Sequence, residues 1–171
     1  IQADALEFPL DGFDLVTGSP PCKKHTVARN IRRGYTKHPD IIAPLRRRLK
    51  DWGGLYVIEN VPGAPLISPV QVCGLALGLN VKRHRWFEAP FDMRGIPPCP
   101  PGHPGNWVTV FGGGAPAKPD NRRRARAGQA REAMQIDWMT RDELSQAIPP
   151  AYTRLIGRFL IESWCAQLGE Q

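Results

Sequence analysis

A cysteine follows two prolines in the segment GSPPC (residues 18–22), directly after the β-prone run at residues 13–17. Proline interrupts both helix and sheet hydrogen bonding, so these residues predict a strand that ends in a rigid loop. The Cys22 thiolate could be presented there to a cleft as a nucleophile, and Lys23, Lys24 and His25 would favour the thiolate form. Alternatively, Cys22 is a small buried hydrophobic residue, the more common role of a lone cysteine.

A carboxylate stands at the end of a second apolar run. Residues 55–58 (LYVI) have the length of a buried strand, and Glu59 follows them directly. A carboxylate at this position is costly to bury unless it binds something. Arg83 and Arg85, which flank His84, could add two guanidinium groups to the same cleft, or they could lie on an ordinary surface.

The elements between these residues would bring Cys22 and Glu59 together. Residues 39–52 place five apolar side chains on one helical face, and Gly53 and Gly54 end this predicted helix. A strand, a helix and a strand in this order form a βαβ unit, whose apolar strands suit a parallel sheet covered on both faces. Such sheets bind ligands at the carboxyl ends of their strands, where Cys22 and Glu59 would both lie.

The rest of the chain predicts a loop-rich insertion and a helical C-terminal part. Residues 89–128 hold many prolines and glycines and a hairpin-like apolar run at 107–111. Thr140 and Glu143 form a capping box, and residues 151–168 carry a helical apolar stripe. We therefore expect a catalytic α/β part at 1–88, the insertion at 89–128, and a helical part at 129–171 that packs back on the catalytic part. The cationic edge of the insertion comprises Arg122, Arg123, Arg124 and Arg126.

Composition favours one domain and an anionic partner. The 171 residues carry 23 Lys+Arg against 16 Asp+Glu, a net charge of +7, and 42% of them are hydrophobic. A chain of this length and hydrophobic fraction can form one compact core. The net positive charge indicates either a polyanionic partner or a solvated basic surface with no ligand. No apolar run is long enough to span a bilayer, and the four cysteines show no CxxC spacing. We therefore expect no membrane partner, no disulfide framework and a reducing cytoplasm.

Four segments in this order resemble motifs of the cytosine-5 DNA methyltransferases, particularly the short forms common in phages. They are SPPC (19–22), YVIENVP (56–62), RHR (83–85) and AIPPAY (147–152), and REA (131–133) is similar to the helical motif before the last of these. The resemblance spans nearly the whole chain. It implies a partial Rossmann-like, mostly parallel sheet with flanking helices and a loop-rich insertion.

The resemblance also implies roles for the residues around the predicted strand ends. Carbon 5 of cytosine is a poor nucleophile, so a thiolate, here Cys22, would attack carbon 6 and push electron density onto carbon 5, which takes a methyl group from S-adenosylmethionine. Glu59 would hold and protonate the ring nitrogen N3. Arg85 would bind the base carbonyl O2, Arg83 would position the catalytic loop and backbone, and Asn60 would support the Glu59 loop.

Cofactor and DNA contacts are implied in the same way. Asp4 occupies the place of the acidic residue that contacts the adenosine part of S-adenosylmethionine, and Pro21, Ile148 and Pro149 would also bind the cofactor. The partner would be double-stranded DNA, from which the target base is flipped out. The arginines at 122–124 and 126 suit phosphate contacts, and guanine edges in addition. A bacterial or phage-encoded enzyme, as in restriction-modification, is expected.

The family begins with a strand and a glycine-rich cofactor turn, and neither precedes Ile1. We therefore expect an N-terminally truncated form, active only with a missing segment or a complementary chain. One alternative is a non-catalytic DNA-binding remnant of such an enzyme. A cysteine hydrolase using Cys22 with His25 or His84 lacks an orienting third residue. A metal site is not expected, because in the set Cys73, Cys99, His103 and Cys165 only the second and third are close in sequence.

Overall fold

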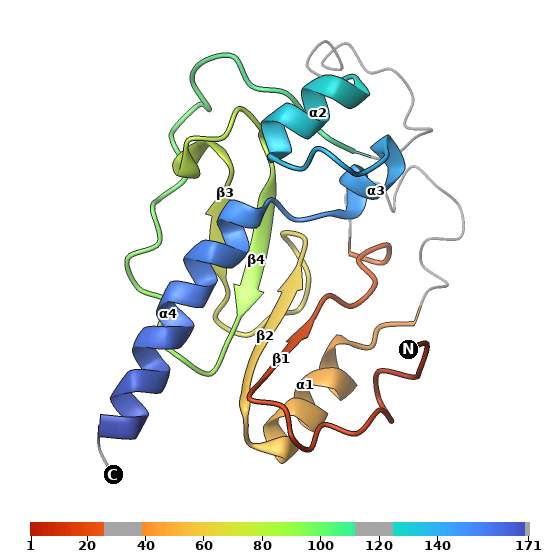
Figure 1. The fold of residues 1–171 in the computed structure, drawn as a ribbon, viewed down its shortest axis with the longest axis vertical. Helices are drawn as coiled ribbons and strands as arrows, with labels where there is room; N and C mark the ends of the chain where they lie inside the picture. Colours follow the sequence, from red (N-terminus) through yellow and green to blue (C-terminus); the bar gives the residue numbers. More distant parts are fainter. Residues whose placement is uncertain (26–38, 112–124, 170–171) are drawn as a thin grey trace. The chain divides into compact units, whose positions relative to one another are not determined.

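The computed structural model describes residues 1–25, 39–111 and 125–169 (Figure 1). The chain forms two compact units, one of Ile1–Gln71 with Arg85–Asp92 and one of Val72–His84 with Met93–Gln171. Along the chain the elements are β1 (Leu15–Gly18), α1 (Ile42–Trp52), β2 (Leu55–Asn60), β3 (Val70–Cys73), the 3-10 helix η3 (Leu75–Leu77), β4 (His84–Glu88), α2 (Ala127–Met134), α3 (Arg141–Gln146) and α4 (Pro150–Gly169).

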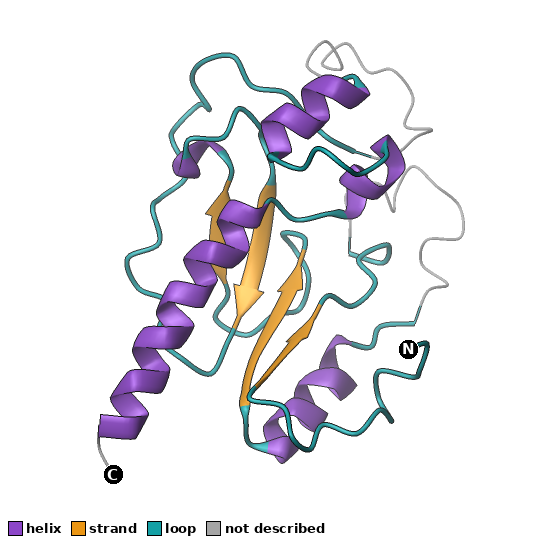
Figure 2. Ribbon diagram, in the orientation of Figure 1, coloured by secondary structure: helices purple, strands orange, loops and turns teal. Residues whose placement is uncertain are grey.

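The four strands form one mixed sheet in the order β1-β2-β4-β3 (Figure 2). Strand β1 pairs with β2 in parallel, with Gly18 opposite Ile58, so the predicted strand-helix-strand unit is confirmed. Strand β4 runs antiparallel to β2, with Glu59 opposite Phe87. The described sheet is therefore mixed where we expected a mostly parallel one. The connection from β3 to its neighbour β4, residues 74–83, is shorter than the dozen or so residues that a parallel crossover needs.

Helix α1 packs on one face of β2 through the apolar stripe that the sequence predicts. Leu45 and Leu49 form a buried cluster with Tyr56 and Ile58. The helix ends at Gly53, whose φ of 80° is the left-handed conformation that favours glycine, and whose N–H donates to the carbonyl of Leu49 at 3.3 Å. This packing fixes which face of β2 each side chain occupies.

The second unit contains the helices of the C-terminal part. Helix α3 begins with the predicted capping box, since the backbone N–H of Thr140 donates to the Glu143 carboxylate at 2.7 Å and the N–H of Glu143 donates to the Thr140 hydroxyl at 3.4 Å. Helix α4 begins at Pro150 and buries Tyr152 and Ile156, as its apolar stripe predicts. Among the described residues, no helix combines the length and apolarity that crossing a membrane requires.

Among the described residues, the run at 107–111 pairs with the segment before β4. Val108 forms an isolated parallel bridge with Val81, and its N–H donates to the carbonyl of Asn80 at 2.9 Å. The loop-rich character predicted for this region is visible in Figure 2, where residues 93–111 are drawn as loop. Residues 93–111 therefore have few regular backbone hydrogen bonds that could fix their conformation.

Candidate active site

The loop that carries Cys22 leaves β1 after Gly18 and turns at residues 22–25. The N–H of His25 donates to the carbonyl of Cys22 at 2.9 Å, and the His25 Nε2 atom lies 3.3 Å from the carboxylate of Asp40. Cys22 is half-buried. A thiol in this setting keeps access to solvent while its backbone is held in a turn, as the nucleophilic role requires.

Asn60 ties this loop to the end of β2. Its side-chain amide donates to the carbonyl of Pro20 at 2.9 Å, and its side-chain oxygen accepts from the N–H of Val61 at 2.9 Å. Asn60 is 1% exposed, so both interactions are made away from water, where an unmade hydrogen bond is costly. The Pro-Pro-Cys segment and the Glu-Asn-Val segment, about forty residues apart in the chain, therefore lie side by side.

Glu59 points to the face of β2 opposite α1. Side chains alternate along a strand, and Tyr56 and Ile58 already pack on the helix. On the other face Glu59 stands opposite Phe87, and Arg85 lies diagonally across. The Arg85 Nε atom is 2.8 Å from the Glu59 carboxylate, and the two side chains are only 15% and 13% exposed. A carboxylate in such an ion pair is held in a fixed orientation.

Arg83 lies in the second unit and binds backbone there. Its guanidinium donates to the carbonyls of Val110 at 2.8 Å, Ser145 at 2.9 Å and Ala147 at 2.6 Å. The residue is 5% exposed. Arg83 thus joins three points of the backbone of the second unit through charge-assisted hydrogen bonds.

A cavity of about 440 Å³ opens beside the end of β1 in the first unit. Pro21 lines it together with Ile1, Ala3, Ala5, Phe8, Leu10, Val16, Thr17, Gly18, Ser19, Pro20, Ile41, Leu45 and Leu49. Asp4 is not among these residues. Its carboxylate accepts from the N–H of Leu6 at 2.8 Å and so closes the N-terminal turn.

The remaining predicted residues belong to the second unit or lie outside the described residues. Ile148 and Pro149 belong to the second unit, where Pro149 is fully buried and its carbonyl accepts from the N–H of Tyr152 at 2.9 Å. Arg126 is exposed directly before α2, and its N–H donates to the side chain of Gln129 at 3.0 Å. Arg122, Arg123 and Arg124 lie outside the described residues.

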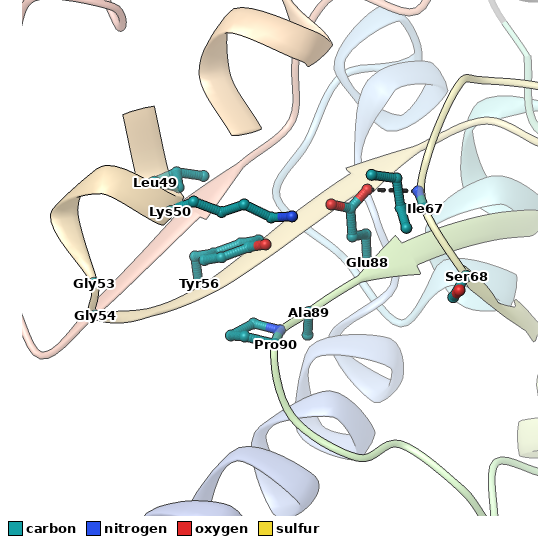
Figure 3. A pocket seen from close by; sticks show the side chains of 10 residues that line it. All are labelled: Leu49, Lys50, Gly53, Gly54, Tyr56, Ile67, Ser68, Glu88, Ala89 and Pro90. Carbon is teal, nitrogen blue, oxygen red and sulfur yellow. Dashed lines mark hydrogen bonds between the residues drawn. The ribbon is translucent and has the colours of Figure 1, made fainter. Parts of the chain in front are cut away.

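A second cavity, of about 410 Å³, lies at the other end of β2 (Figure 3). Its buried carboxylate, Glu88, is already satisfied: the Arg46 guanidinium donates to it at 2.6 and 2.8 Å and the N–H of Ile67 at 2.8 Å. The hydrogen bond to Glu88 raises the pKa of Arg46, and burial raises the pKa of the neighbouring Tyr56. This arrangement indicates a structural ion pair, and none of the predicted catalytic residues lines the cavity.

Comparison with known proteins assigns no family. No known family model matches the chain, and no curated protein matches it. The functional interpretation therefore depends on the residues themselves: a half-buried cysteine, an adjacent asparagine that fixes its loop, and a glutamate held by an arginine.

One cluster of metal-ligating side chains was not predicted from the sequence. Cys73, His84, Cys99 and His103 lie together, with ligand atoms within 4.8 Å of one another. The candidate set considered from the sequence contained Cys165 in place of His84. Cys165 is exposed on α4 and is not a member of the cluster, whose fourth residue is His84. The available signal was the Cys99-x3-His103 spacing. Strand ends supply the other two residues, so only the fold reveals the set.

Proposed function

We propose that this chain is the catalytic part of a DNA (cytosine-5) methyltransferase. The observation that carries the proposal is the hydrogen bond from Asn60 to the carbonyl of Pro20, beside the Glu59–Arg85 pair. The hydrogen bond and the ion pair together join three of the four segments whose resemblance to that family suggested the activity, at the sheet edge where α/β proteins bind ligands. The parallel β1-α1-β2 unit supports the proposed Rossmann-like arrangement.

The proposed reaction begins at Cys22. Its thiolate adds to carbon 6 of an extruded cytosine, and the electron pair of the 5,6 double bond moves to carbon 5. Glu59 hydrogen-bonds and protonates N3, where negative charge develops only after the attack, so its stabilising effect falls on the transition state. Arg85 holds the Glu59 carboxylate in place and, as the resemblance implies, binds the carbonyl O2. After methylation, water takes the proton from carbon 5, the 5,6 double bond reforms as the Cys22 thiolate leaves carbon 6, and N3 returns its proton to Glu59.

S-adenosylmethionine, when bound, supplies the methyl group that carbon 5 takes. The cavity at the end of β1 supports such a ligand, because its volume of about 440 Å³ lies within the range of about 300–1,000 Å³ typical of small-molecule sites. Its lining is mostly apolar. It includes Pro20 and Pro21, which directly precede Cys22 in the chain. Phe8 and Ile41 would pack against the flat adenine, which suits apolar surfaces.

The proposed substrate is double-stranded DNA in a bacterial or phage-infected cytoplasm. The net charge of +7 favours a polyanion, and Arg126 is an exposed cation at the start of α2. A target base inside the duplex is out of reach of Cys22, so the enzyme would flip it out of the stack.

The test is methyl transfer from labelled S-adenosylmethionine to genomic DNA, which contains every short target sequence, with 5-methylcytosine measured by nucleoside mass spectrometry. We expect Cys22→Ser to lower the product more than about 10³-fold, because serine is a far weaker nucleophile at neutral pH. Cys165→Ser, which removes an exposed cysteine on α4, is the matched control and keeps the activity. Salt-dependent DNA binding that Cys22→Ser leaves unchanged, with no covalent adduct on DNA that contains 5-fluorocytosine, would support the non-catalytic DNA-binding alternative instead.

A further inference from the structure

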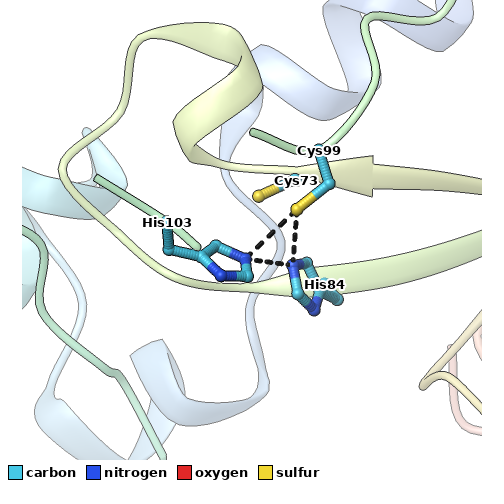
Figure 4. A group of neighbouring side chains, drawn as sticks. All are labelled: Cys73, His84, Cys99 and His103. Atoms are coloured by element: carbon cyan, nitrogen blue, oxygen red, sulfur yellow. Dashed lines mark hydrogen bonds between the residues drawn. The ribbon is translucent and has the colours of Figure 1, made fainter. Parts of the chain in front are cut away.

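We propose that Cys73, His84, Cys99 and His103 bind one zinc ion that holds the second unit together. All four residues belong to this unit, and their ligand atoms lie within 4.8 Å of one another. Figure 4 shows both sulfur atoms and both imidazole rings directed at one small region. The site is separate from the chemistry proposed for Cys22 and stands whether or not the chain transfers methyl groups.

The three distances among His84, Cys99 and His103 are close to those of a tetrahedral ion. The Nε2 atoms of His84 and His103 are 3.0 Å apart, and the Cys99 sulfur is 3.3 Å from the first and 3.1 Å from the second. Zinc bonds of about 2.0–2.1 Å to nitrogen and 2.3 Å to sulfur put neighbouring ligand atoms about 3.3–3.8 Å apart in a tetrahedron. Shifts of a few tenths of an ångström would open the three contacts to that spacing.

Hydrogen bonding alone is a poor reason for this arrangement. Each Nε2 atom carries at most one proton, and each faces both the other imidazole nitrogen and the Cys99 sulfur. A single cation at the centre engages all of these lone pairs at once. Two thiolates and two imidazoles are a ligand set that zinc prefers, and four protein ligands leave no open position for substrate. The site is therefore structural.

The backbone around the cluster is specialised for this convergence. Cys73 ends β3 and His84 begins β4, and the N–H of Gly74 donates to the carbonyl of Arg83 at 3.3 Å. Gly74 allows the close approach, because a Cβ atom there would lie 2.4 Å from the carbonyl oxygen of Val81. The two strand ends are thus brought together by backbone contacts, which places the first two ligands.

The other two ligands come from a loop in an unusual conformation. Cys99 is flanked by two prolines on each side, and these have no N–H with which to pair. His103 has a φ of 50°, which is unfavourable for a residue other than glycine. Its N–H donates to Pro100 at 3.2 Å and its carbonyl accepts from the Trp107 indole at 2.6 Å. A metal bond to His103 would offset the unfavourable backbone conformation. It would also anchor this loop, which the sheet does not hold in place.

The test is the metal content of the whole purified chain, followed by cobalt substitution. We expect about one zinc per chain, and a loss of most of it in Cys99→Ser and in His103→Ala. Cys165→Ser and Cys22→Ser, which alter cysteines outside the cluster, are matched controls and keep the metal. Removal of zinc by a chelator should lower the melting temperature by more than about 5 °C, and added Zn²⁺ should restore it.

Cobalt separates metal binding from a merely structural effect of the substitutions. Co²⁺ in the wild-type chain should give the intense visible bands of a tetrahedral ion and a thiolate charge-transfer band. His103→Cys should keep the ion and strengthen the charge-transfer band by about half, since three thiolates replace two. Wild-type chain that takes up neither Zn²⁺ nor Co²⁺, a Cys73–Cys99 disulfide in reducing buffer, or undiminished zinc in both Cys99→Ser and His103→Ala would overturn the proposal.

Discussion

The candidate active site and the Cys/His cluster are assembled by different means. In the candidate active site, Glu59 and Asn60 end strand β2, and their pairing with Phe87 and Trp86 of β4 sets their positions. In the cluster, strand ends supply only Cys73 and His84, and a proline-flanked loop supplies Cys99 and His103. A site on paired strands is held by the sheet, whereas a site on a loop needs a cross-link of its own. Substitutions in the candidate active site should therefore mainly lower the reaction rate. Substitutions in the Cys/His cluster should mainly lower the stability of the fold.

Glu59→Gln should give the largest effect in this comparison. Glutamine keeps the side-chain oxygen that Arg85 contacts but cannot protonate N3, so methyl transfer should fall about 10²–10⁴-fold, the usual contribution of a general acid or base. Single-turnover rates would measure the loss, and zinc content, measured in parallel, should not change. An unaltered rate would remove Glu59 from the chemistry, and a loss of zinc would show that the two sites are not independent.

Asn60→Ala tests how the sheet holds the Cys22 loop. The change leaves the buried carbonyl of Pro20 and the N–H of Val61 without their partners, and it should lower the free energy of unfolding by about 1–3 kcal/mol. Displacement of the Cys22 loop should slow methyl transfer in addition, by up to about 10²-fold. Urea unfolding measures the first effect. Asn106→Ala is the control, since Asn106 is exposed, and an equal loss in both variants would contradict the tethering role of Asn60.

Thr140→Ala should give the smallest effect, because the cap that Thr140 forms on α3 is local. Loss of an N-cap hydroxyl costs about 1 kcal/mol. Hydrogen bonds from the side chain and backbone of Thr140 lower the pKa of Glu143 below its ordinary value of 4.5. A lowered pKa in the folded state stabilises the fold above the unfolded value, and this contribution disappears as the pH falls through the folded value.

The pH profile of urea unfolding measures this contribution of Glu143. The difference between the wild-type chain and Thr140→Ala should be largest near pH 7 and should shrink below about pH 4. Asp142→Asn, which changes a neighbouring exposed carboxylate in the first turn of α3, is the control. A difference that stays constant down to pH 2 would contradict the role assigned to the Glu143 hydrogen bonds.

Local sequence patterns predicted the elements that depend on local chemistry. The apolar runs at 13–17 and 55–58 and the helical stripe between them gave β1, α1 and β2, and the Thr140 capping box gave the start of α3. Strand β4 (His84–Glu88) was not predicted, because its sequence HRWFE shows no alternation of apolar and polar residues. Its antiparallel pairing with β2 depends on long-range contacts that no local pattern encodes.

The same distinction separates the two sites. Cys22 and Glu59 became candidates because Cys22 lies in the loop after β1 and Glu59 lies near the end of β2, and the carboxyl ends of parallel neighbours meet. The metal cluster could not be predicted, because Cys73 and His84 come together through the pairing of β3 with β4 and the hydrogen bond from Gly74 to Arg83, which no local pattern encodes. Cys165 was grouped with the cluster by residue type alone, and its exposed place on α4 excludes it.

The most direct test of the central claim is to locate a covalent bond between Cys22 and a pyrimidine. Duplex DNA that carries 2-pyrimidinone, whose electron-poor carbon 6 accepts a thiolate without methyl transfer, is incubated with the chain, and the digested adduct is mapped by mass spectrometry. We predict the added mass on the peptide that contains Cys22, and its absence in Cys22→Ser. An adduct confined to another cysteine, or DNA binding with no adduct at all, would contradict the account.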